Sequence, residues 1–192
     1  MRKQGASKHP LTIVSLFLLL AILSIFLADL GTGLMRQRRE DAIYDSVLLS
    51  ARAYHVSPAM VMAVIRVESD FKADAHSSVG AQGLMQILPD TFRYLKKEHL
   101  HEDLSDKDLW DPTVNVRYGT YYLSYLFERF GHWQAALAAY NAGEGRVAAW
   151  LADPTLSDGT VLFTIPFEET ENYVARVLDA YHEYLKKYQL KE

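Results

Sequence analysis

Residues 56–88 read VSPAMVMAVIRVESDFKADAHSSVGAQGLMQIL, an apolar run followed by a segment of small residues. Ser57 is a residue type that can cap the free N–H groups at the start of a helix. Pro58 loses no hydrogen bond at the first helical position. The later segment contains Gly80 and Gly83, which let backbone come close to neighbouring groups. The stretch therefore predicts a helix that begins at Ser57 and a loop that packs closely beside it.

One carboxylate, Glu68, follows Val61 and Ile65 at positions i, i+4 and i+7, so it shares their apolar stripe on this helix. Apolar neighbours withhold the water that stabilises an ionised carboxylate, and the negative end of the helix dipole is close. Both effects raise the pKa of Glu68 and favour a proton donor near neutral pH. A glutamate at a helix end is also commonly a solvated residue, so the helix alone leaves both interpretations open.

Four blocks of sequence follow one another along the chain. They are Glu68-Ser69-x-Phe71, Ser77-x-Val79-Gly80-Ala81-x-Gly83-Leu84-Met85-Gln86, Ala138-Ala139-Tyr140-Asn141-Ala142-Gly143, and Ile165-Pro166-Phe167-x-Glu169-Thr170 with Tyr173-Val174. In order and spacing they resemble the signature blocks of the soluble lytic transglycosylase domain, glycoside hydrolase family 23, over about residues 41–187. Two positions depart from the family pattern: Glu144 stands where the family often has proline, and Glu171 where it often has arginine.

The resemblance implies a lysozyme-like helical domain that cleaves the MurNAc-GlcNAc β-1,4 bond of peptidoglycan. It implies that Glu68 protonates the glycosidic oxygen, with help from the substrate's N-acetyl group. Glu68 would then take the proton of the 6-hydroxyl, which closes onto C1 and leaves a 1,6-anhydromuramoyl end. By the same resemblance Ser77 contacts the N-acetyl group, Met85 and Gln86 line the groove, and Tyr140 faces the reacting sugar. No cofactor is implied.

Hydrolysis of a glycoside normally needs two carboxylates, about 5 to 5.5 Å apart in retaining and about 6.5 to 9.5 Å apart in inverting enzymes. Asp70 is two residues beyond Glu68, so on a continuing helix it would point away from it. Asp74 lies in the following loop, and nothing in the sequence fixes it opposite Glu68. Two alternatives stay open: a lysozyme-like hydrolase that uses Asp74 as its base, and a non-catalytic wall-binding scaffold.

Charge and composition exclude several other functions. Residues 1–40 hold six basic and two acidic residues, whereas the remainder holds 14 basic and 22 acidic residues, a net charge of −8. An acidic domain is a poor nucleic-acid ligand, because affinity for phosphate backbones comes largely from Lys and Arg. The chain has no cysteine, and His99 and His101 point apart on a helix, so we expect no metal site. Protein partners cannot be assigned.

Residues 11–28 include only Thr12, Ser15 and Ser24 as polar residues, and as a helix they are about 27 Å long, close to a bilayer core. A cleaved signal peptide is the alternative, but its apolar region is normally shorter. The expected organisation is a cytoplasmic N-terminus (1–10), a transmembrane signal anchor (11–30), a linker (31–40), the catalytic domain (41–187) and a tail (188–192). Because peptidoglycan lies outside the cytoplasm, we expect a single-pass inner-membrane protein with an extracytoplasmic (periplasmic) domain.

The rest of the chain predicts helices. Pro89 and the pair Asp111-Pro112 are helix starts, and Gly131 is a helix stop. Residues 96–108 are charge-rich and predict a loop or a frayed helix, and residues 168–187 predict a closing helix. Sustained alternation with a period of two is absent, so the fold class is all-α.

Overall fold

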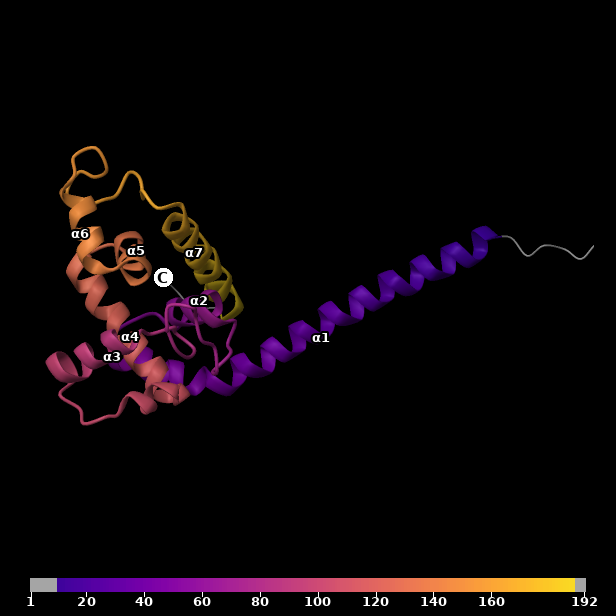
Figure 1. Ribbon diagram of the computed structural model, residues 1–192, viewed down its shortest axis with the longest axis horizontal. Helices are drawn as coiled ribbons and strands as arrows, with labels where there is room; N and C mark the ends of the chain where they lie inside the picture. Colours follow the sequence, from indigo (N-terminus) through magenta and orange to yellow (C-terminus); the bar gives the residue numbers. More distant parts are fainter. Residues whose placement is uncertain (1–9, 189–192) are drawn as a thin grey trace, which may run out of the picture. The chain divides into compact units, whose positions relative to one another are not determined.

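The computed structural model describes the backbone of residues 10–188 and the side chains of residues 17–188 (Figure 1). The chain divides after Asp41 into two compact units, Met1–Asp41 and Ala42–Glu192. The described part of the first unit, residues 10–41, is one segment of helix, and the second unit contains the hydrophobic core. The described residues form isolated β-bridges but no strand, so the all-α prediction is confirmed.

Helix α1 runs from Pro10 to Ala53 without a break. Its portion within residues 17–53 is long and apolar enough to cross a membrane, and none of the apolar window is buried. Part of the expected anchor, residues 11–16, lies outside the described side chains. The segment expected as a linker, 31–40, is helical and continues α1, and it contains no proline that would interrupt the helix. Residues 42–53 belong to the second unit, and there Val47 and Ala51 enter the core.

Helix α2, Pro58–Ser69, lies at the centre of the second unit. Every residue from Ala59 to Ile65 is fully buried, so the helix is enclosed on all sides rather than along one stripe. It begins with Pro58 at the first turn as expected, but the Ser57 side chain makes no capping hydrogen bond. It ends at Ser69. Asp70, the next residue, adopts a left-handed conformation, and its backbone N–H donates to the Arg66 carbonyl.

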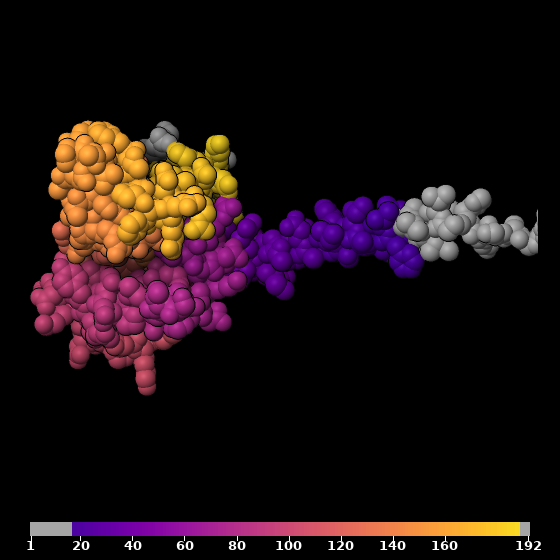
Figure 2. All heavy atoms as spheres, turned by 45° about the horizontal axis from the view of Figure 1, so that its top comes forward, coloured from indigo at the N-terminus to yellow at the C-terminus, as the bar shows by residue number. Residues whose placement is uncertain are grey.

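In the part of the chain that the structure describes, seven further helices follow α2. They are α3 (Pro89–Tyr94), the π-helix η1 (Leu95–Leu100), the 3-10 helix η2 (Asp106–Trp110), α4 (Pro112–Phe130), α5 (Trp133–Ala142), α6 (Glu144–Ala152) and α7 (Glu168–Tyr188). Helix α7 packs along α2, and α5 packs against α4, α6 and α7. In Figure 2, α6 and α7 (orange to yellow) form one side of this unit, and the segment from α2 to α3 (purple to pink) forms the other.

Local signals for the later helices are confirmed with one correction. The Asp111 side chain accepts hydrogen bonds from the N–H groups of Thr113 and Val114, and Gly131 ends α4 in the left-handed region. Residues 96–108 are more ordered than expected, because most of η1 and the first part of η2 fall within them. A bidentate ion pair between Arg117 and Glu102 joins this segment to α4 and explains the added order.

Candidate active site

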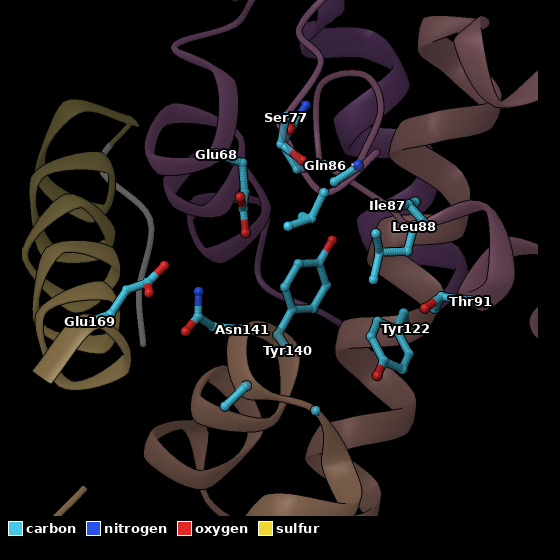
Figure 3. A pocket seen from close by; sticks show the side chains of 14 residues that line it. Glu68, Ser77, Gln86, Ile87, Leu88, Thr91, Tyr122, Tyr140, Asn141 and Glu169 are labelled. Atoms are coloured by element: carbon cyan, nitrogen blue, oxygen red, sulfur yellow. Dashed lines mark hydrogen bonds between the residues drawn. The ribbon is translucent and has the colours of Figure 1, made fainter. Parts of the chain in front are cut away.

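A pocket of about 350 Å³ opens beside the C-terminal end of α2 (Figure 3). Four of the five residues expected at the site line it, although they come from three separate segments of the chain. They are Glu68, Ser77, Gln86 and Tyr140. The fifth, Met85, does not line the pocket.

Glu68 reaches the pocket from the last turn of α2 and is half-buried. Its surroundings raise the pKa of Glu68 from 4.5 to about 7, mainly because burial removes the water that stabilises the charged form. The Tyr173 hydroxyl and the positive charge of Arg176 partly oppose this rise. Near neutral pH, a large fraction of Glu68 therefore carries a proton that it can donate.

Tyr173 projects from α7 toward Glu68 and is 3% exposed. Its buried hydroxyl interacts with the Glu68 carboxylate, and it has no other hydrogen-bond partner among the described residues. Burial and the nearby charge of Glu68 raise the pKa of Tyr173 well above its usual value, so its hydroxyl keeps its proton. Such contacts at acid–base groups often tighten only when substrate is bound.

The loop that carries Ser77 and Gln86 is closed by its own hydrogen bonds. The Ser77 hydroxyl oxygen accepts a bond from the N–H of Ala81 at 2.9 Å, which leaves the hydroxyl proton as the donor toward a ligand. The Gln86 amide nitrogen donates to the carbonyls of Ala75 at 3.0 Å and Gly83 at 2.8 Å. This loop therefore presents one hydroxyl and one amide from a fixed frame.

Met85 corrects one expectation. Its side chain is fully buried and packs against Gly119 of α4, where even a methyl group would collide with the sulfur. Its backbone serves the site instead, because its carbonyl accepts a 2.8 Å hydrogen bond from the Tyr140 hydroxyl. A loop has no regular periodicity that would show which side chains point into the core, so the motif alone misplaced the Met85 side chain.

Asn115 of α4 holds the loop that carries Gln82 and Met85 through hydrogen bonds of its buried side chain. It is fully buried, and its side-chain oxygen accepts a 2.8 Å bond from the N–H of Met85. Its amide nitrogen donates to the carbonyls of Gln82 at 2.9 Å and Leu109 at 3.0 Å. The sequence carried no signal for this role, since the contact spans about thirty residues.

Tyr140 stands at the end of α5 and faces the pocket. Burial, together with the charge of Glu68, raises the pKa of Tyr140 well above its usual value. Its ring lies 5.3 Å from that of Tyr122, a member of the aromatic series on α4 that also lines the pocket. Next to it, the Asn141 side-chain oxygen accepts a 2.8 Å bond from the Thr170 hydroxyl, so the amide nitrogen is the end available to a ligand.

Both carboxylates that line the pocket are glutamates, Glu68 and Glu169. Glu169 comes from the first turn of α7 and lies across the pocket from the Gln86 side (Figure 3). It belongs to the fourth sequence block, but spacing gave no reason to place it beside Glu68. Asp74, the base considered for a hydrolase, is exposed and does not line the pocket, and neither does Asp70.

Among the side chains of residues 17–188, no cluster of three or more His, Asp or Glu residues could hold a metal ion. His99 instead places its Nδ1 atom 3.0 Å from the Tyr121 hydroxyl.

Comparison with known proteins places this chain in one family. Residues 46–163 match the family model described as the transglycosylase SLT domain. The soluble lytic murein transglycosylase of Salmonella typhimurium is 41% identical over an alignment of 137 residues that covers 68% of this chain and 21% of that protein. Membrane-bound lytic murein transglycosylase C of Klebsiella pneumoniae is 28% identical over an alignment of 164 residues that covers 72% of this chain and 45% of that protein.

A solved structure is similar as well. An inactive mutant of the lytic transglycosylase Slt from Pseudomonas aeruginosa aligns with a TM-score of 0.70 and 37% sequence identity. The alignment covers 77% of this chain and 24% of that one. The chain thus spans about a fifth of the length of the first curated relatives that it matches.

Proposed function

Because the chain belongs to the transglycosylase SLT domain family, we propose that it is a membrane-anchored lytic transglycosylase that cleaves peptidoglycan glycan strands between MurNAc and GlcNAc. The observation that carries the proposal is the pocket in which Glu68 holds a proton up to a pH of about 7. A neutral carboxylic acid beside bound sugar is the group that departure of a glycosidic oxygen requires.

In the proposed reaction Glu68 gives its proton to the glycosidic oxygen as the C1–O bond breaks. The carbonyl oxygen of the muramoyl N-acetyl group supports C1 from the opposite face, and the Ser77 hydroxyl donates to that group. Glu68, now a carboxylate that Tyr173 stabilises, removes the proton of the 6-hydroxyl. The 6-oxygen closes onto C1 and gives a 1,6-anhydromuramoyl end, and Glu68 recovers its proton. Tyr140 and Gln86 would hold the sugar on either side.

The test of this role is Glu68→Gln, which keeps the shape of the side chain and removes the transferable proton. We expect wall-lytic activity to fall by at least about a hundredfold, the low end of general acid–base contributions, while the unfolding temperature stays close to that of the wild type. Glu171→Gln, an exposed acidic residue of α7, is the matched control and should retain activity. A Glu68→Gln protein that clears purified peptidoglycan at nearly the normal rate would end the proposal.

A second candidate, a hydrolase, has one observation in its favour: Glu169 supplies the second carboxylate that Asp74 does not. A hydrolytic base would activate water, so Glu169→Gln would then abolish the formation of reducing ends. In the transglycosylase the same variant changes substrate binding but leaves the identity of the product unchanged.

The same proposal includes location. A helix able to span a membrane precedes the domain, and one similar relative is described as membrane-bound. The proposed arrangement is a single-pass inner-membrane protein with the Ala42–Glu192 unit on the extracytoplasmic side, where its substrate lies.

A further inference from the structure

One departure from the family pattern lies beside the pocket. Glu144, which stands where the family often has proline, is the first residue of α6 and directly follows Gly143, a residue of the pocket wall. Gly143 has φ 94° and ψ 138°. This ψ suits a residue that precedes proline, and a proline at the first helical position loses no hydrogen bond. The backbone would therefore accept proline at position 144, and the glutamate side chain is what distinguishes this chain.

The Glu144 carboxylate binds two residues of α4. It accepts a 2.7 Å hydrogen bond from the Arg129 guanidinium and a 3.1 Å bond from the Tyr125 hydroxyl. Arg129 also donates to the Tyr125 hydroxyl oxygen at 3.1 Å, so the three groups are bonded in a closed triangle. The side chains of Arg129 and Glu144 are 41% and 31% exposed, so water screens their ion pair only in part. We call Glu144, Arg129 and Tyr125 the Glu144 network.

The Glu144 network joins two parts of the pocket wall. One part is the turn between α5 and α6, where residues 141–143 line the pocket. The other part is Tyr122 of α4, which also lines the pocket (Figure 3). The ring of Tyr122 is nearly parallel to that of Tyr125, with an interplanar angle of 14° and ring centroids 6.3 Å apart. The bonds of Glu144 to α4 therefore limit how far the turn can move from Tyr122.

We propose that Glu144 and Arg129 are positioning residues, which hold the turn between α5 and α6 at the distance from Tyr122 that the bound sugar needs. The inference rests on the proposed function. Neither residue lines the pocket, so each acts through a neighbour: Glu144 through Gly143, and Arg129 through the carboxylate that it binds. The ion pair thus restricts this turn through contacts with α4, whereas a proline would restrict it through its own ring.

The test measures KM and kcat of the full-length protein in detergent micelles, from the release of anhydro ends by soluble, uncrosslinked glycan strands. Glu144→Ala should raise KM by about three- to fivefold, the upper range for a partly exposed ion pair, and leave kcat within about twofold. KM changes alone because the pocket wall binds the sugar equally before and during the reaction. Glu102→Ala breaks a 2.6 Å ion pair of similar exposure with Arg117, away from the pocket lining, so this control should lower stability without changing KM.

Coupling between the two positions decides the assignment. Arg129→Ala should raise KM as Glu144→Ala does, and the double variant should be no worse than either single one. Glu144→Pro should return KM to within about twofold of the wild type, and Arg129→Ala added to it should have no further effect. An unchanged KM in Glu144→Ala, or additive losses in the double variant, would overturn the positioning role.

The wild-type protein separates this inference from the proposed function. If it releases no anhydro ends from the strands, the proposed function fails. If it releases them and Arg129→Ala raises KM equally with Glu144 and with Glu144→Pro, only the positioning role fails.

Discussion

The protonation of Glu68 depends on side chains that come from two ends of the domain. Burial at the C-terminal end of α2 raises the pKa of Glu68, whereas Tyr173 and Arg176 of α7 lower it. The net value of about 7 places the change of charge inside the physiological range, where a group can both give and take a proton. The site thus balances a strong effect of burial against weaker polar contacts.

This balance predicts the effect of Tyr173→Phe on the pH profile. A general acid must be protonated, so kcat/KM of the wild type should fall as the pH rises through about 7. The Tyr173 hydroxyl favours the ionised form, so its removal should raise the pKa of Glu68 and move this alkaline limb to higher pH. Tyr181→Phe, another tyrosine of α7, is the control. An unchanged or lowered midpoint in Tyr173→Phe would contradict the assigned role of the contact.

Single residues of the site could be predicted only where a local pattern carried the information. The apolar stripe on α2 correctly predicted the direction of the pKa shift of Glu68. Tyr173 and Glu169 reach the pocket region from α7, about a hundred residues later, and no spacing in the sequence reports such a contact. Met85 was misplaced for a related reason, since its orientation depends on Gly119 of another helix.

At the scale of elements, the site is a loop, 75–88, held between α2 and α4. Ser69 at the end of α2 donates to the Leu84 carbonyl at 2.8 Å, and Asn115 of α4 makes three hydrogen bonds to Gln82, Met85 and Leu109. Only glycine fits at position 83, because an added Cβ would collide with the Asn115 side chain. The loop is therefore ordered by the elements around it, which lets its small residues form a rigid wall.

Asn115→Ala should weaken this wall. The change leaves the N–H of Met85 and two carbonyls without their partners in a fully buried place, which costs about 2 to 4 kcal/mol of unfolding free energy. Calorimetry or denaturant unfolding measures the loss, and lytic activity should fall as well because Tyr140 bonds to the Met85 carbonyl. Asn172→Ala, an exposed asparagine of α7, should be nearly neutral. Equal stability of the two variants would show that the Asn115 hydrogen bonds do not hold the loop in place.

The positions of most helices followed from their own end signals, such as the Asp111 cap and Gly131. The packing of the helices could not be predicted in this way. That α7 packs against α2 depends on contacts between segments about a hundred residues apart in the sequence. The sequence predicted residues 31–40 as a linker without predicting their conformation, and the structure shows that α1 continues through them.

At the scale of the whole molecule, an apolar helical segment precedes an acidic domain. Helix α1 has 44 residues and is about 66 Å long, whereas a bilayer core needs only about 30 Å. The helix therefore has length to spare beyond a membrane crossing. We expect protease added to spheroplasts to remove the domain, and inverted vesicles to protect it. Release of the full-length protein from membranes by salt would contradict an anchor.

The central claim is that the enzyme makes anhydro ends without water, and the masses of its products test it most directly. Full-length protein incubated with purified peptidoglycan should release muropeptides about 18 Da lighter than the products of hydrolysis, because the 6-hydroxyl replaces water as the group that closes on C1. Reaction in ¹⁸O-labelled water should leave these products unlabelled. Reducing ends that carry solvent oxygen would instead show that Glu169 or another group activates water, and the transglycosylase assignment would be wrong.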